Sequence, residues 1–143
     1  MKRALLLAVA AFTATWALAQ SASGPVVKSP SQIDWKASGS LPPGAEYHLI
    51  YEDPKTHAVQ TMVRMPKGYS LPKHAHTADE TILVLKGKIV LKFENREETV
   101  AQGGYAVIPA GTSFELKAEG FGGVSFLAAF NGPYDAKGAV PAK

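Results

Sequence analysis

The chain has 143 residues, of which 46% are hydrophobic and 19% charged, and its formal net charge is +3. This length is sufficient for one packed domain and not for two. Cysteine is absent, which excludes disulfides, thiolate metal ligands and thiol catalysis, and the small net charge does not support binding of nucleic acid through bulk charge.

Residues 1–19 have the pattern of a secretory signal peptide. Lys2 and Arg3 give a positive start, residues 4–14 are almost entirely apolar, and residues 17–19 read Ala-Leu-Ala, the small-x-small pattern of signal peptidase. The apolar run is short for a transmembrane span of about 20 residues. We therefore expect cleavage after Ala19, a periplasmic or secreted protein, and no stable association with a membrane. Loss of Lys2 and Arg3 lowers the net charge from +3 to +1.

The two ends of the remaining chain lack the pattern of a packed element. Residues 20–43 are rich in Ser, Pro, Gly and Ala, which predicts a flexible N-terminal arm. Ile33 and Trp35 are the residues of this arm that could dock onto the domain. Residues 136–143 are predicted to form a flexible tail, which leaves residues 44–135 as the folded domain.

Short runs of alternating apolar and polar residues follow one another from residue 44 onward. Ile89, Leu91 and Phe93 fall on one face of such a run, and charged side chains occupy the other face, as in a half-buried antiparallel strand. No window has a helical period with caps. The predicted strands are 47–51, 59–65, 74–76, 81–85, 88–93, 99–102, 105–108, 113–117 and 124–130. Many short strands separated by turns indicate an all-β sandwich or barrel.

His74, His76 and Glu80 form a candidate metal site. Histidines two residues apart lie on the same face of an extended strand, and a carboxylate just past the next turn can reach the same point. Two imidazoles and one carboxylate with open positions suit iron, manganese or zinc. Asp79 is a rival for Glu80, although it would point to the opposite side of an extended segment. The alternative interpretation is a surface turn with incidental histidines.

This stretch resembles the first signature motif of the cupin family, G-x5-H-x-H-x3-E-x6-G. Every fixed position of that motif is filled, by Gly68, His74, His76, Glu80 and Gly87. The second motif, G-x5-P-x-G-x2-H-x3-N, is matched in part. Its glycines and proline are present, whereas Phe114 stands at the metal-binding histidine and Ala118 at the asparagine; the matched residues are Gly103, Pro109 and Gly111.

The resemblance covers residues 41–135 and extends to a small branch of the family. Segments 42–47, 52–54 and 131–133 look like those of the branch that includes the cupin modules of zinc-dependent anti-sigma factors. The resemblance implies a double-stranded β-helix, or jelly-roll, cupin barrel. It also implies one divalent transition metal (Fe, Mn, Zn or Ni) held by His74, His76 and Glu80, a small-molecule ligand, and pairing into a homodimer through strand edges.

The replacement of the second-motif histidine by Phe114 leaves two outcomes open. One is a three-ligand site with open positions for substrate or oxygen, and the other is a site that no longer holds a metal. His48 or His57 could supply a ligand from a neighbouring strand, although exposed loop or strand positions are the favoured interpretation for both.

Several residues near the motif are candidates for substrate binding in an apolar pocket. They are Arg64, Met62, Tyr105 and Phe114, with Tyr69 and Phe126 as further candidates for the pocket wall. Arg64 could bind a carboxylate substrate. The competing interpretation is core packing for the aromatic residues and a surface position for Arg64.

Three functional hypotheses follow. The first is a metal-dependent enzyme of oxygenase, isomerase or decarboxylase type acting on a small organic molecule. The second is a non-catalytic cupin that binds a small ligand or a metal as a sensor or carrier, and the third is a metal-free structural cupin. Serine hydrolase and nucleotide-dependent chemistry are unsupported, because the sequence contains neither a G-x-S-x-G elbow nor a phosphate loop.

Overall fold

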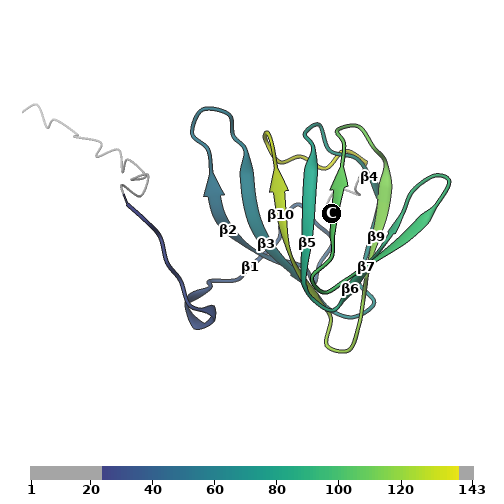
Figure 1. Ribbon diagram of the computed structural model, residues 1–143, viewed down its shortest axis with the longest axis horizontal. Helices are drawn as coiled ribbons and strands as arrows, with labels where there is room; N and C mark the ends of the chain where they lie inside the picture. Colours follow the sequence, from purple (N-terminus) through teal and green to yellow (C-terminus); the bar gives the residue numbers. More distant parts are fainter. Residues whose placement is uncertain (1–23, 139–143) are drawn as a thin grey trace, which may run out of the picture.

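The computed structural model describes residues 24–138, which form two antiparallel β-sheets that face each other (Figure 1). One sheet has six strands in the order β1-β2-β3-β10-β5-β8, and the other has four in the order β4-β9-β6-β7. The strands are β1 (Lys36–Ala37), β2 (Glu46–Glu52), β3 (Val59–Met65), β4 (Ser70–His74), β5 (Glu80–Lys86), β6 (Lys88–Lys92), β7 (Glu97–Ala101), β8 (Tyr105–Ile108), β9 (Phe114–Glu119) and β10 (Val124–Phe130). A turn of 3-10 helix, η1 (Pro30–Gln32), precedes them.

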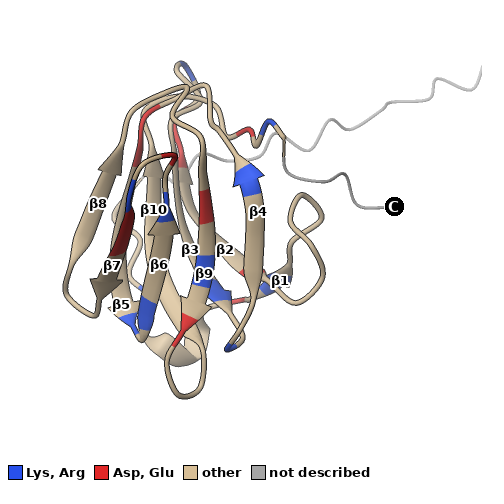
Figure 2. Ribbon diagram, turned by 90° about the vertical axis from the view of Figure 1, so that its right-hand side faces the viewer, with Lys and Arg blue, Asp and Glu red and all other residues tan. Residues whose placement is uncertain are grey.

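The all-β prediction is confirmed, and the facing sheets form the expected jelly-roll barrel. Eight of the nine predicted strands match observed strands to within two residues at each end. The ninth, expected at residues 74–76, is β4, which begins earlier and ends at His74. In the side view of Figure 2, the four-stranded sheet faces the viewer.

Alternation along the central strand builds the core. In β10, Val124, Phe126, Ala128 and Phe130 are buried, and the residues between them are only partly covered. This strand pairs with β3 on one side and with β5 on the other, so its inward side chains lie at the middle of the six-stranded sheet. They pack with inward residues of the opposite sheet, among them Ile89, Leu91, Phe114 and Leu116.

Part of the N-terminal segment is attached to the outside of the barrel. Lys36 and Ala37 form β1 and pair with the start of β2. The guanidinium of Arg64 lies 4.4 Å from the centre of the Trp35 ring, and Tyr69 donates a hydrogen bond of 2.7 Å from its hydroxyl to the Pro42 carbonyl. Burial raises the pKa of Tyr69 to about 12, which keeps this donor protonated.

Residues 1–23 and 139–143 lie outside the described part of the chain, and the predicted signal peptide falls within the first of these segments. Between residues 24 and 138, no helix has the length and apolar character needed to cross a membrane.

Candidate functional site

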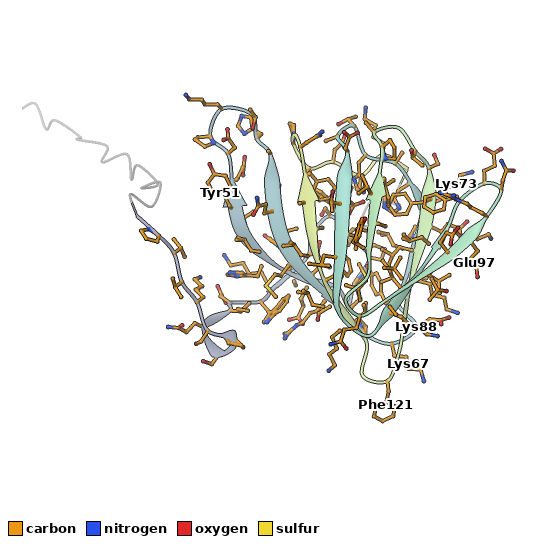
Figure 3. All side chains as sticks on the ribbon, viewed as in Figure 1. Tyr51, Lys67, Lys73, Lys88, Glu97 and Phe121 are labelled. Carbon is orange, nitrogen blue, oxygen red and sulfur yellow. The ribbon has the colours of Figure 1, made fainter. Side chains whose placement is uncertain are left out.

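A cavity of about 390 Å³ lies between the two sheets. Most of its wall is apolar, and the strands β3 and β10 on one side and β4 and β9 on the other contribute side chains to it. His74, His76 and Glu80 all line this cavity. Figure 3 shows Lys73, the neighbour of His74, at the upper end of the barrel, and Lys67 and Phe121 at the opposite end.

His74 and His76 reach the cavity from different local structures. His74 is the last residue of β4, whereas His76 follows Ala75, which forms an isolated bridge with Lys137. The expectation that both histidines lie in one strand is therefore wrong. Their rings nevertheless meet edge to face, with centroids 5.0 Å apart, and both side chains are buried.

Backbone carbonyl groups fix the tautomer of both imidazoles. His74 Nδ1 lies 2.8 Å from the Pro72 carbonyl oxygen, and His76 Nδ1 contacts the Asp135 carbonyl oxygen. Because a carbonyl oxygen can only accept, each Nδ1 carries the proton and donates it. The lone pair is therefore on Nε2 in both rings, which is the state in which histidine binds a metal.

Glu80 is the first residue of β5 and is 5% exposed. Its Oε2 atom is buried and has no hydrogen-bond partner, which is costly for a carboxyl group. Burial raises the pKa of Glu80 to about 8, and burial also lowers the pKa of His74 and of His76. Although His76 Nε2 lies 3.4 Å from Glu80 Oε2, the two groups are therefore mainly uncharged at neutral pH and do not form a salt bridge.

The donor set fits a divalent metal in its chemistry. It offers two unprotonated imidazole nitrogens and a carboxylate oxygen that lacks a partner. Within residues 24–138, no three His, Asp or Glu side chains already converge as a ready metal-binding group. Binding of an ion by these three residues would thus require local rearrangement of their side chains, together with ionisation of Glu80.

Phe114 lies beside His74, as the second-motif alignment implied. The two residues are paired across β9 and β4, and their ring centroids are 4.4 Å apart. Phe114 is only 1% exposed and lines the cavity. An apolar ring therefore takes up the space next to the first histidine.

The other predicted substrate-binding residues do not line the cavity. Thr61, Val63 and Met65 of β3 point inward, so Met62 and Arg64 must point outward. Arg64 instead forms an ion pair of 2.6 Å with Glu46. Gln60, Met62 and Arg64 lie at alternate positions and therefore on the same face of β3. Because Gln60 and Arg64 are polar, the sequence already indicated that this face, including Met62, points outward.

Tyr105 is also outside the cavity, because it is 70% exposed on the strand β8 at the edge of the six-stranded sheet. Asp79 is engaged in a loop, where its carboxylate accepts hydrogen bonds from Ala110 N and Asn131 Nδ2. His48 Nδ1 bonds the Asp34 carbonyl, and His57 Nδ1 lies 2.9 Å from Glu52 Oε1 in an exposed hairpin. None of these three residues lines the cavity.

The C-terminal segment contributes residues that the sequence reasoning missed. Tyr134 lines the cavity, and its ring lies 5.8 Å from that of His76 and 5.2 Å from that of Phe130. Burial raises the pKa of Tyr134. Asp135 holds His76 through its backbone carbonyl. The sequence analysis placed Tyr134 and Asp135 within the folded domain, but no local signal indicated that they lie at the site.

Comparisons with known proteins agree on the fold. Residues 23–131 match the family described as the ChrR cupin-like domain. The comparison with curated proteins gives no match. Among solved structures, the chain is similar to the polyketide cyclase RemF from Streptomyces resistomycificus, with 19% identity over 84% of this chain and 88% of that one and a TM-score of 0.64.

Two further solved structures are similar. KdgF from Halomonas sp. shares 17% identity over 71% of this chain and 91% of its own, with a TM-score of 0.60. The DMSP lyase DddQ from Ruegeria pomeroyi shares 16% identity over 79% of this chain and 64% of its own, with a TM-score of 0.63. At these identities the similarity shows the fold alone.

Proposed function

The chain belongs to the family of ChrR cupin-like domains, and on this premise we propose that it binds one divalent transition metal and a small organic molecule in its barrel. His74, His76 and Glu80 would hold the metal, which is Fe, Mn, Zn or Ni. The observation that carries this proposal is the state of the three metal-binding side chains. Both histidine Nδ1 atoms donate hydrogen bonds to backbone carbonyls, which leaves Nε2 free to bind a metal, and Glu80 Oε2 is buried without a partner.

The bound metal would supply a Lewis acid that polarises an oxygen atom of the ligand. The protein groups around it would keep the two imidazoles in the ligating tautomer, and the apolar wall of the cavity would exclude bulk water. This arrangement is compatible with an enzyme of oxygenase, isomerase or decarboxylase type. Binding of a cation would also lower the pKa of Glu80 and so remove the cost of its ionisation.

A non-catalytic sensor or carrier is the second candidate, and the position of Phe114 favours it. Its ring lies against His74, where the second motif of cupins has a fourth ligand. A site with three protein ligands binds a metal more weakly than a site with four, which suits reversible occupancy. Turnover by the metal-loaded protein would exclude this second candidate.

Export to the periplasm or the cell exterior remains part of the proposal. It rests on the signal-peptide pattern of residues 1–19. Detection of a mature N-terminus at Gln20 in the periplasmic or secreted fraction of a native host would support it.

Elemental analysis of residues 20–143, purified without an affinity tag or added metal, tests the metal site. We expect about one metal ion per chain, and its loss in His74→Ala. His57→Ala is the matched control, because it removes an exposed histidine that also bonds an acidic side chain. Full occupancy in His74→Ala, or no uptake after anaerobic reconstitution with each ion, would contradict the proposal.

A further inference from the structure

The cavity has a polar end and an apolar end, both marked on β10. Phe130 stands beside His76, with ring centroids 5.0 Å apart, and is paired with Glu80. Phe126 lines the cavity four residues away along the same strand. At about 3.3 Å per residue, Phe130 and Phe126 lie about 13 Å apart along the strand. Val63, Met65, Leu71 and Leu116 add apolar side chains to the wall. Ser38, Ser40 and Tyr47 also line it and carry hydroxyl groups but no charge.

The cavity wall provides no cation for an anionic ligand. In the described residues 24–138, its lining includes neither lysine nor arginine. Arg64, the cation that the sequence suggested for substrate binding, faces outward and contacts Glu46 and Trp35. Transfer of a carboxylate into an apolar space without a partner is strongly unfavourable.

The two acidic side chains of the cavity wall are also not available to bind a ligand. Glu80 is the proposed metal ligand, and Glu52 bonds His57 at the β2–β3 hairpin. Thr61 donates its hydroxyl to the His48 carbonyl, so it does not offer a free donor to a ligand. Recognition by the protein therefore depends on apolar contact along most of the cavity.

We infer that, in the absence of a bound metal, the cavity takes an uncharged molecule with one polar end and an apolar body about 10 Å long. The body lies toward Phe126, and the polar end lies among His74, His76 and Glu80. This inference deepens the proposed function and shares its cavity with it. The apolar body does not need the metal, so the two can be tested separately.

The first test is a calorimetric titration of metal-free protein, in EDTA, with straight-chain primary alcohols of four to ten carbons. Each added methylene should lower Kd about fourfold. The gain should stop at about eight carbons, where the chain reaches the length of the cavity. Octanoate should bind at least about tenfold more weakly than octanol, because its charge has no partner. Equal affinity for octanoate, or no dependence on chain length, would overturn the inference.

Two neighbouring alanines provide a matched pair of variants. Ala128 is buried and lines the cavity, whereas Ala129 is partly covered on the other face of β10. Ala128→Leu should fill part of the cavity and weaken octanol binding about tenfold or more, while Ala129→Leu should leave it unchanged. Equal effects of the two substitutions would overturn the inference. The chain-length series uses the unsubstituted protein, so it decides the question even if Ala128→Leu fails to fold.

The metal measurement separates this inference from the proposed function. Loss of metal uptake with the octanol series intact would overturn the metal site and leave the ligand class standing. Metal bound by His74, His76 and Glu80 without any binding of alcohols would overturn the ligand class alone.

Discussion

Glu80 combines burial with the absence of a hydrogen-bond partner for Oε2. A structural carboxylate would normally be satisfied by donors, as Asp79 is by Ala110 N and Asn131 Nδ2. Two acidic residues that are adjacent in the sequence therefore have different roles, since one closes a loop and the other lines the cavity. Glu80 Oε2 lies 3.4 Å from His76 Nε2, and the proposed metal would stabilise the ionised form of this carboxyl group.

Glu80→Gln should change the pH dependence of the stability of the metal-free protein. The pKa of Glu80 is raised from 4.5 to about 8 in the folded state, so the folded state binds this proton more tightly than the unfolded state does. The resulting stability is complete below pH 4.5 and is lost as the pH rises toward 8. At pH 8.5 we expect the variant to exceed the parent in free energy of unfolding by on the order of 4 to 5 kcal/mol.

Urea unfolding in EDTA at pH 5 and at pH 8.5 measures this effect. Asp79→Asn is a poor control because it would disturb the hydrogen bonds that hold the Asp79 loop. The parent protein at the two pH values therefore serves as the reference. A difference between parent and variant that does not change with pH would show that Glu80 is not buried as a neutral group.

Phe114→His should strengthen metal binding. The new imidazole would stand where a ring already lies 4.4 Å from that of His74, so it could complete a set of four ligands. We expect Kd for zinc to fall by about tenfold or more, measured by competition with a chromogenic chelator. Phe126→His is the matched control, since Phe126 is also buried in the cavity wall but at its apolar end. Equal gains in both variants would mean that position 114 has no special relation to the site.

At the scale of the elements, alternation predicted the strands well because it reports which face of a sheet is buried. The same rule, applied within β3, would have placed Arg64 outside the cavity, because Thr61, Val63 and Met65 occupy the inward positions. Local pattern could not reveal the attachment of residues 134–138, since Ala75 pairs with Lys137 across 62 positions of sequence. The motif located His76, but the residue that orients it belongs to this distant segment.

Asp135→Ala should weaken metal binding without removing a ligand. The Asp135 carboxylate accepts hydrogen bonds of 2.8 Å from Thr77 N and 2.9 Å from Thr77 Oγ1, which hold the carbonyl that orients His76. Loss of such support for a ligating histidine typically costs about 10- to 100-fold in affinity. The same chelator competition measures it.

Asp53→Ala is the control for this substitution. The Asp53 carboxylate also accepts two backbone hydrogen bonds, from Lys55 N and Thr56 N, but in the β2–β3 hairpin. Its zinc affinity should equal that of the parent. A loss of affinity in Asp53→Ala as large as that in Asp135→Ala would point to general loosening of the barrel.

At the scale of the whole molecule, the two ends of the barrel differ in structure. The end with the site contains a cavity, and its ligand-bearing loop is held by the C-terminal segment. The opposite end is closed by backbone packing between the β5–β6 hairpin and the β9–β10 loop. Gly87 and Gly123 both have positive φ, and a Cβ on Gly87 would overlap the Gly123 carbonyl oxygen.

Gly123→Ala and Gly103→Ala test the closed end, because both glycines have φ of +83°. At Gly103 nothing lies within 4 Å of an added Cβ, so only the backbone conformation is unfavourable and the cost should be about 1 kcal/mol. At Gly123 the Cβ would overlap the Met65 carbonyl oxygen, which should raise the cost to about 3 kcal/mol or more. Urea unfolding measures both values. Metal stoichiometry should stay at the parental value in the two variants, since the substitutions lie far from His74. Equal destabilisation of the two variants would mean that the backbone around Gly123 accommodates a Cβ as easily as the open turn at Gly103 does. The barrel would then not be tightly packed at this end.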